Sequence, residues 1–173
     1  MLFELAKPHI LNEISQLYDD LNDYLDEHTN YPGWKKGIYP TRIDAEAGIH
    51  ANELFVLRKE GVIVGSVIVN HSQEPTYAGA IWQSEAVGDE VLVIRTLVTH
   101  PNYMKQGISQ ILLACVKEHA LSLGCKSIRL DVAVQNEPAI TLYEKCGYTY
   151  VGTVDLGLPY EHLKWFRLYE LVL

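Results

Sequence analysis

The sequence predicts an α/β (α+β) fold in which a mixed, mostly antiparallel β-sheet is flanked by helices on both faces. In the second half of the chain, β-rich segments alternate with helical ones, which implies at least one parallel strand pair with a right-handed crossover. In the first half, two β-rich segments stand three residues apart, as in an antiparallel hairpin. The 173 residues contain no repeat and no linker, so we expect residues 1–173 to form a single domain.

The N-terminal part is predicted to hold two helices and the hairpin. Apolar side chains recur at three- and four-residue steps over 11–25, which indicates an amphipathic helix. Two prolines and two glycines in 30–40 end this helix and predict a shaped loop. Thr41, with Asp44 three residues later, is typical of a helix N-cap, and we expect a short helix over 42–49. Strands are expected over 54–58 and 62–70.

The remaining elements follow an irregular segment over 71–89, which we expect to be a long loop. A strand is expected over 90–99, and then an amphipathic helix over 107–123 that ends at Gly124. A strand (126–134), a helix begun by proline (138–146) and two closing strands (148–154 and 163–172) complete the chain. The last strand either pairs across a homodimer interface or lies inside the sheet, and the sequence leaves both open.

The charge balance bears on the class of partner. The formal net charge is −8, so a nucleic acid or an anionic membrane surface would be repelled on average. A cationic small molecule would be attracted, although many ordinary soluble proteins are acidic as well. We therefore expect neither nucleic acid nor membrane as a partner.

The cysteines and the N-terminus bear on the compartment. Cys115, Cys125 and Cys146 have no CxxC spacing, so they indicate neither a disulfide framework nor a metal site. The first ten residues, MLFELAKPHI, lack the basic and apolar regions of a signal peptide. No apolar run approaches the roughly 18 residues of a membrane span. These features predict a cytoplasmic protein.

The segment 97–110, LVTHPNYMKQGISQ, predicts an anion site. It reads as a strand that turns through a loop into the long helix. Backbone N–H groups in the first turn of a helix have no intrahelical acceptor, and the helix dipole adds partial positive charge there. A pyrophosphate is a natural ligand for such a turn, although an ordinary turn has the same pattern.

A second segment downstream makes the pattern specific. The chain reads LDVAVQN over 130–136 and continues with Ala139, Leu142, Tyr143 and Gly147. With the first segment, it resembles the GNAT acetyltransferases, whose motifs read "V-x-P-x-Y-R-G-x-G-I-G" and then "N-x-x-A-x-x-L-Y-x-x-x-G-F". The resemblance covers about residues 50–155 and implies the GNAT-like form of the predicted fold, with acetyl-CoA as cofactor and an amine as acceptor.

The resemblance also implies which residues bind the cofactor. The backbone of Leu97, Val98 and Thr99 is expected to pair with the pantetheine arm like an added strand. Asn136 is expected near the thiol end. The pyrophosphate would lie on the turn and the helix start, with the Lys105 side chain adding charge, at Lys105, Gln106, Gly107, Ile108, Ser109 and Gln110.

Two residues are the candidates for catalysis. The resemblance makes Tyr143 the general acid that protonates the leaving thiolate, which a tyrosine hydroxyl can do. Asp131 occupies a strand position where some relatives carry a catalytic glutamate, so it is the candidate general base, though family members without an assigned base also have aspartate there. Weaker base candidates are Glu85, Asp89, His100 and His71.

The chain departs from the family motif at two positions. Met104 stands where an arginine or glutamine is usual, which removes a phosphate-binding side chain. Ser109 stands where glycine or alanine is usual, and its hydroxyl is able to donate to phosphate. These departures motivate an alternative function, a non-catalytic acyl-CoA-binding regulatory module.

Aromatic residues are the candidates for binding the acceptor. Trp34, Tyr39 and Trp82 are the main candidates to wall a pocket for a small-molecule or peptide amine, with Tyr31 and Tyr77 beside them, since aromatic faces suit a cation or an apolar body. The alternative is that they pack the N-terminal helices onto the sheet. A nucleotide-dependent oxidoreductase is disfavoured, because no GxGxxG follows an early strand.

Overall fold

The computed structural model describes residues 1–173, which form seven strands and four α-helices. The strands are β1 (Leu2–Leu5), β2 (Leu54–Lys59), β3 (Val62–Asn70), β4 (Val91–Thr99), β5 (Ser127–Ala133), β6 (Thr149–Asp155) and β7 (Trp165–Val172). The helices are α1 (Leu11–Glu27), α2 (Arg42–His50), α3 (Ile108–Ser122) and α4 (Glu137–Lys145). The predicted elements are present, and β1 is an addition that the sequence did not indicate.

The strands form one sheet in the order β1-β2-β3-β4-β5-β7-β6. The pair β4–β5 is parallel, and the pairs β1–β2, β2–β3, β5–β7 and β6–β7 are antiparallel. This confirms the predicted mixed, mostly antiparallel sheet with helices. No helix of the protein has the length and apolar character that crossing a bilayer requires.

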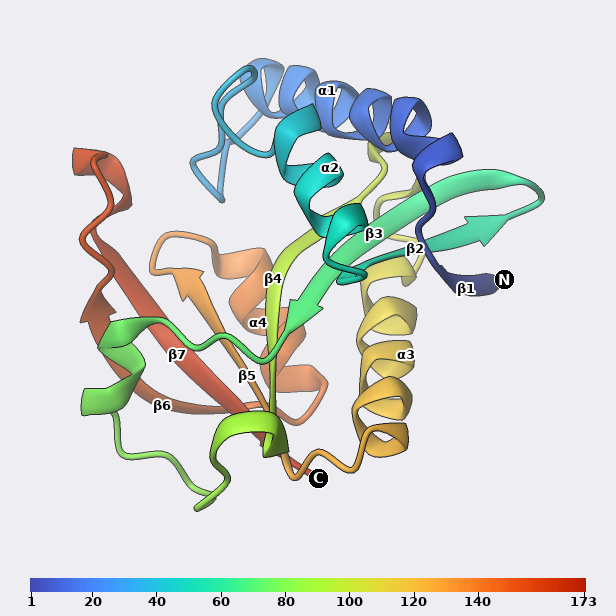
Figure 1. Cartoon of the computed structure of the whole chain (residues 1–173). Helices are drawn as coiled ribbons and strands as arrows, with labels where there is room; N and C mark the ends of the chain where they lie inside the picture. Colours follow the sequence, from blue (N-terminus) through green and yellow to red (C-terminus); the bar gives the residue numbers. More distant parts are fainter. The chain divides into compact units, whose positions relative to one another are not determined.

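The chain divides into two compact units, and the first contains Met1–Asn30, Trp34–Val69 and Thr96–Cys115. Figure 1 shows α1 and α2 lying side by side over the β2–β3 hairpin, and buried residues of all four elements form one apolar cluster. The hairpin turns at Glu60 and Gly61, which both have positive φ (52° and 84°). Two such residues in a row are what a tight turn between twisted strands requires.

The start of α2 confirms the predicted N-cap. The Thr41 backbone N–H donates to Asp44 Oδ2 at 2.6 Å, and the Thr41 hydroxyl donates to the same oxygen at 2.8 Å. These bonds satisfy a donor that the helix itself cannot, which explains why the helix begins there. The short strand β1 pairs with β2 through four residues, too few for an alternating pattern to be recognised in the sequence.

The second unit contains Tyr31–Gly33, Asn70–Arg95 and Val116–Leu173. The predicted long loop between β3 and β4 includes two 3-10 turns, Pro75–Gly79 and Gly88–Glu90. Strand β7 pairs with β5 on one side and with β6 on the other, so it lies inside the sheet. The sequence left open whether this strand pairs across a homodimer interface or lies inside the sheet, and the structure places it inside. Strand β6 forms the edge of the sheet.

Candidate functional site

The turn before α3, in the first unit, has the geometry of an anion site. Lys105 and Gly107 both have positive φ, 60° and 77°, a conformation that is uncommon for a residue with a side chain. A Cβ added at Gly107 would meet only Gln110 Oε1, at 3.7 Å, so the space over the turn is open. The Lys105 side chain is exposed. Together with the free N–H groups that begin a helix of 15 residues, these features suit a bound pyrophosphate.

The two departures from the motif have distinct structural roles. Met104 packs against the apolar cluster of the first unit, so its side chain contributes to the core. The Ser109 hydroxyl lies 2.7 Å from Thr99 Oγ1, which ties the first turn of α3 to the end of β4. Ser109 therefore has a protein partner, and the side chain left to provide positive charge on this turn is Lys105.

The end of β4 packs closely against β3. A Cβ added at Gly65 would lie 2.8 Å from the backbone oxygen of Val98 and 2.8 Å from Leu112 Cδ1, closer than side chains tolerate. Val98 is buried, whereas Leu97 and Thr99 on either side of it are partly exposed. Gly65 is thus required for the position of the strand segment that is predicted to pair with the pantetheine arm.

In the second unit, the structure brings together the two catalytic candidates, Asp131 and Tyr143. The parallel pairing of β4 with β5 runs to Ile94 and Leu130, and Asp131 follows directly. Burial raises the pKa of the Asp131 carboxyl above its ordinary value. Burial, and then the negative charge of Asp131, raise the pKa of Tyr143, which is 6% exposed. The phenol therefore stays protonated, and the two groups interact electrostatically.

Asn136 is the N-cap of α4. Its Oδ1 accepts a hydrogen bond from the Ala139 backbone N–H at 3.4 Å, and a proline follows at the helix start. The oxygen of the amide is therefore used by the helix, and its NH₂ group is the part suited to donate to a ligand carbonyl.

The three aromatic candidates have partners in the protein. Trp34 and Tyr39 meet edge to face with ring centroids 5.4 Å apart, and the Tyr39 hydroxyl bonds Thr96 Oγ1. The Trp82 ring lies 4.2 Å from the guanidinium of Arg129, and its Nε1 donates to the Tyr77 backbone oxygen at 2.9 Å. These contacts fix the ring orientations, and the role of the three residues in substrate binding stays a prediction.

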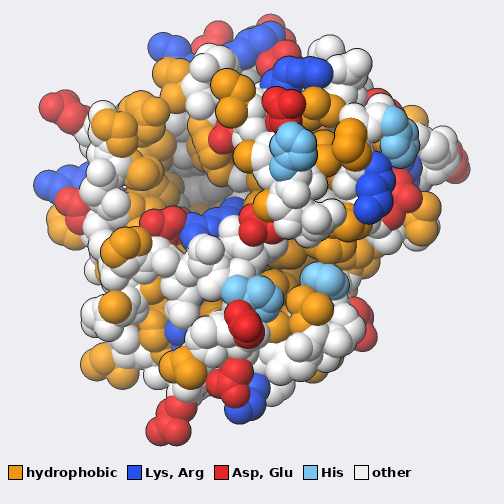
Figure 2. Space-filling view, viewed as in Figure 1, with side chains coloured by type: hydrophobic (Ala, Val, Ile, Leu, Met, Phe, Trp, Pro, Cys, Tyr) orange, Lys and Arg blue, Asp and Glu red, His pale blue; other side chains and the backbone are white.

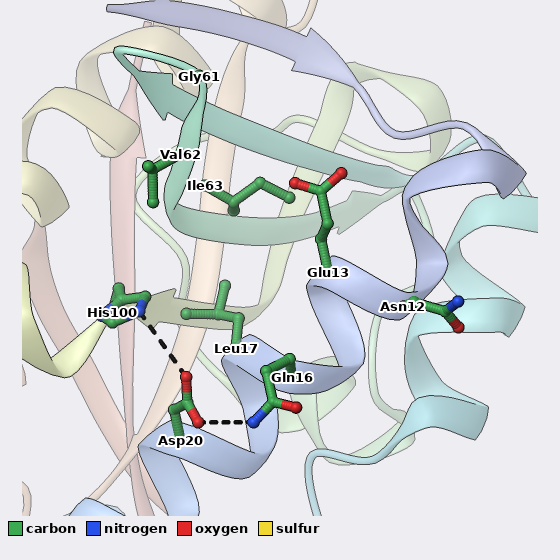
Figure 3. A pocket seen from close by; sticks show the side chains of 9 residues that line it. All are labelled: Asn12, Glu13, Gln16, Leu17, Asp20, Gly61, Val62, Ile63 and His100. Atoms are coloured by element: carbon green, nitrogen blue, oxygen red, sulfur yellow. Dashed lines mark hydrogen bonds and ion pairs between the residues drawn. The ribbon is translucent and has the colours of Figure 1, made fainter.

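The weaker base candidates are dispersed. Glu85 and Asp89 are exposed, and His71 Nδ1 lies 2.8 Å from the Val91 backbone oxygen. His100 lies 3.8 Å from Asp20 in a groove of about 470 Å³ between α1 and the β2–β3 turn (Figure 3). The other residues that line this groove are Asn12, Glu13, Gln16, Leu17, Gly61, Val62 and Ile63.

The sequence indicates Tyr77 only as an aromatic residue of a substrate pocket and gives no sign that it contacts Asp131. The Tyr77 hydroxyl donates to Asp131 Oδ2 at 2.6 Å, across 54 positions of sequence. Arg95, the last β4 residue of this unit, pairs with Glu74. Both contacts come from the long loop, where no periodic pattern shows which side chain meets the sheet. The one sequence feature related to this contact is an aromatic residue, Tyr77, in a long loop.

Charged side chains of both signs are present at the surface. Figure 2 shows acidic and basic side chains interspersed with apolar ones on the face it draws.

The sequence matches the model of a known protein family and is similar to curated relatives. Residues 14–148 match the model of the acetyltransferase (GNAT) family. A streptothricin acetyltransferase from Escherichia coli is 33% identical over 86 residues, which cover 45% of this chain and 49% of that protein. The chain spans about half the length of the curated relatives it matches, or less.

Solved structures share the fold over nearly the whole chain. A GNAT-family acetyltransferase from Streptococcus agalactiae 2603 has a TM-score of 0.81 and 19% identity, covering 99% of this chain and 95% of that chain. A protein from Salmonella typhimurium, solved with its cofactor acetyl-CoA, has a TM-score of 0.71 and 14% identity, covering 99% and 93%. At these identities the likeness shows the fold alone.

Proposed function

The chain belongs to the acetyltransferase (GNAT) family, and from this premise we propose that it transfers an acetyl group from acetyl-CoA to a primary amine on a small molecule or a peptide. The amine attacks directly while both substrates are bound. The reaction is proposed to take place in the cytoplasm, because the spacing of the three cysteines in the sequence indicates no disulfide framework.

The turn before α3 fits the phosphates of the cofactor. Lys105 and Gly107 both have positive φ, a conformation that occurs in anion-binding turns, and the Lys105 side chain adds a full positive charge. Bound acetyl-CoA supplies the thioester carbonyl that the amine attacks and the thiol that leaves. The pantetheine arm is assigned to Leu97–Thr99 and the thiol end to Asn136, as the family motif implies.

The observation that carries the proposal is that Asp131 and Tyr143, both in the second unit, interact electrostatically. A carboxyl with a raised pKa can accept the proton that the attacking ammonium must lose. A buried phenol with a raised pKa keeps its proton and can give it to the departing sulfur. One unit thus supplies a candidate acid and a candidate base, which a module that only binds acyl-CoA would not need.

Trp34, Tyr39 and Trp82 are proposed to bind the acceptor amine through their ring faces. The acidic net charge of −8 favours an acceptor that is a cation. The similarity to a streptothricin acetyltransferase makes streptothricin one member of the amine panel, beside lysine and a peptide with a free N-terminus. The protein is also proposed to form a homodimer, and light scattering tests this by measuring its mass in solution.

Acetyl-CoA is expected to raise the melting temperature of the protein, whereas NAD and ATP are not. A ligand at a hundred times its dissociation constant adds about 2.7 kcal/mol to the free energy of unfolding, which a thermal scan detects readily. A panel of amines then tests for acetyl transfer. Stabilisation by acetyl-CoA without transfer to any amine would favour the non-catalytic module, and the absence of stabilisation would contradict the cofactor assignment.

Lys105→Ala is expected to weaken acetyl-CoA binding about tenfold, because a charged hydrogen bond to phosphate contributes about 1.5–3 kcal/mol. The loss should shrink as salt is added, since the side chain is exposed and its charge is screened. Titration calorimetry at two salt concentrations measures both effects. Lys117→Ala, at another exposed lysine, is the control and should bind like the wild type. Equal affinity of Lys105→Ala and wild type would rule out this contact.

A further inference from the structure

A buried ion pair fastens the β3–β4 loop to the sheet of the second unit. Glu170 on β7 is fully buried, and Arg129 on β5 is 4% exposed, with Arg129 Nε 3.2 Å from Glu170 Oε1. The same carboxylate accepts hydrogen bonds from the Gln83 backbone N–H at 2.6 Å and from the Ser84 hydroxyl at 2.5 Å. Two residues of the loop are therefore bound to a group that the sheet holds in place.

The Arg129 guanidinium makes further contacts with the loop. It donates to Gln73 Oε1 at 2.7 Å and to the Ala86 backbone oxygen at 3.2 Å, and it lies over the Trp82 ring. Contacts at Gln73 and Ala86 fix both ends of a segment that contains Tyr77. The buried pair therefore helps to hold this segment, which also contains the 3-10 turn Pro75–Gly79, on the sheet.

Tyr77 is the residue that this arrangement directs at the candidate base. Its side chain is 1% exposed and packs on Trp82, with ring centroids 5.3 Å apart. Its backbone oxygen accepts the Trp82 Nε1 hydrogen bond, so ring and backbone are both held. The hydroxyl at the end of this fixed side chain donates to Asp131 Oδ2 at 2.6 Å.

Charged and titratable groups from three neighbouring elements interact with the Asp131 carboxyl. The loop contributes Tyr77 and Glu74, β4 contributes Arg95, and α4 contributes Tyr143. Burial raises the pKa of Asp131, the Tyr77 hydrogen bond and the Arg95 charge lower it, and the Glu74 charge raises it. Glu74 is itself paired with Arg95, so Tyr77 is the group that bonds the Asp131 carboxylate directly.

We infer that Tyr77 is a positioning residue for Asp131: its hydrogen bond favours the charged form of the carboxylate and holds it in one orientation. The inference rests on the proposed function, in which Asp131 is the general base. A single donor on Oδ2 leaves Oδ1 as the oxygen to accept the proton from the amine. The β3–β4 loop thereby holds the candidate base Asp131 through Tyr77. The Arg129–Glu170 pair, which holds the loop, affects the reaction only indirectly.

Tyr77→Phe removes the hydroxyl and keeps the ring. The lost hydrogen bond favoured the carboxylate, so the pKa of Asp131 rises further, by about one pH unit for a hydrogen bond to a charged group. The base then needs a higher pH to be deprotonated. The acid limb of the pH profile of kcat/KM is expected to move up by the same amount.

Tyr169→Phe is the matched control. Tyr169 is also a buried tyrosine of this unit, and its hydroxyl donates to the Glu144 carboxylate at 2.8 Å. Both variants lose one hydrogen bond from a buried phenol to a carboxylate, so both are expected to lose some stability. Only Tyr77→Phe changes a bond to Asp131, and only that variant should shift its titration.

The experiment follows the Asp131 carboxyl carbon by NMR through a pH titration of the wild type and both variants without ligand. An upward shift of about one pH unit in Tyr77→Phe alone supports the inference. No shift, or equal shifts in both variants, overturns it. Acetyl-transfer pH profiles are measured on the same proteins. If the pKa of Asp131 shifts in Tyr77→Phe but the acid limb of the pH profile of kcat/KM does not, Tyr77 is still the hydrogen-bond partner of Asp131. In that case Asp131 is not the general base, and the proposed function fails at this point.

The reciprocal variant keeps the test decisive if Tyr77→Phe does not fold. Burial and then the charge and hydrogen bond of Asp131 raise the pKa of Tyr77, so its hydroxyl keeps its proton. In Asp131→Asn the charged acceptor is gone, so the NMR signal of the Tyr77 hydroxyl proton is expected to lose the downfield shift that the 2.6 Å bond to the carboxylate gives it in the wild type. A Tyr77 hydroxyl signal that is unchanged in Asp131→Asn overturns the inference.

Discussion

Tyr143→Phe is expected to lower the rate of acetyl transfer by about 10²- to 10⁴-fold, the usual contribution of a positioned general acid. Acetyl-CoA binding should be nearly unchanged, because the phenol is 6% exposed and its ring stays in place. Steady-state rates with the best amine of the panel, combined with calorimetric affinities for acetyl-CoA, separate the two effects.

Tyr148→Phe is the control for this prediction. The Tyr148 ring lies 5.8 Å from that of Tyr143, it is also buried, and its hydroxyl has no hydrogen-bond partner. The two variants make the same chemical change in neighbouring rings, so a role in packing would affect both alike. Full activity in Tyr143→Phe would exclude this residue as the acid and leave the proton to water or to the amine.

The pH profile of the acetyl-transfer rate also tests the role of Tyr143. Burial raises its pKa above the ordinary tyrosine value, and the neighbouring carboxylate adds to the effect. The phenol therefore remains an acid throughout the range in which enzymes are assayed. Any basic limb in the rate profile below the ordinary tyrosine pKa is expected to persist in Tyr143→Phe, since it must belong to another group.

Local sequence signals predicted the parts of the fold and site that local contacts determine. Thr41 and Asp44 are three residues apart, and their capping bonds form within one helical turn. The turn at Lys105 and Gly107 likewise follows from a short motif, and its positive φ angles agree with an anion-binding role. Such features need no knowledge of the rest of the chain.

Contacts between distant segments could not be predicted from local patterns. Tyr77 meets Asp131 because the loop is held by Glu170, a residue 93 positions further along the chain than Tyr77. Met104 looked like a lost phosphate ligand, whereas the structure uses it to fill the core of the first unit. In both cases the tertiary arrangement assigns the role, and the residue type alone is compatible with several.

Glu170→Gln is expected to lower the free energy of unfolding by about 3–5 kcal/mol, the usual cost of breaking a buried ion pair from one side. Both carboxylate oxygens accept hydrogen bonds, Oε1 from Ser127 and Ser84 and Oε2 from the Gln83 N–H. In Glu170→Gln, an NH₂ group replaces one of the two accepting oxygens, so its hydrogens would meet the hydrogens of the groups that now donate to that oxygen. The Arg129 guanidinium would also lose its counter-charge. Urea denaturation measures the change.

Glu90→Gln provides the surface control for this loss. Glu90 pairs with Lys126 at the surface of the same unit, where an ion pair contributes about 0–1 kcal/mol. A loss in Glu170→Gln as small as that of the control would mean that the buried carboxylate does not hold the loop. A loss well above that of the control would support the role of the buried pair in holding the loop that carries Tyr77.

The acid sensitivity of the wild type should depend on the same carboxylate. Burial raises the pKa of Glu170, but hydrogen bonds from Ser127, Ser84 and Gln83 outweigh burial and hold the pKa below its ordinary value. A folded-state pKa below the unfolded one means that the stabilisation is complete above the unfolded pKa and is lost as the pH falls through the folded one. Urea midpoints measured over acidic pH should therefore fall more steeply in the wild type than in Glu170→Gln. Parallel curves would show that Glu170 is not the titrating group, even if its removal destabilises the loop.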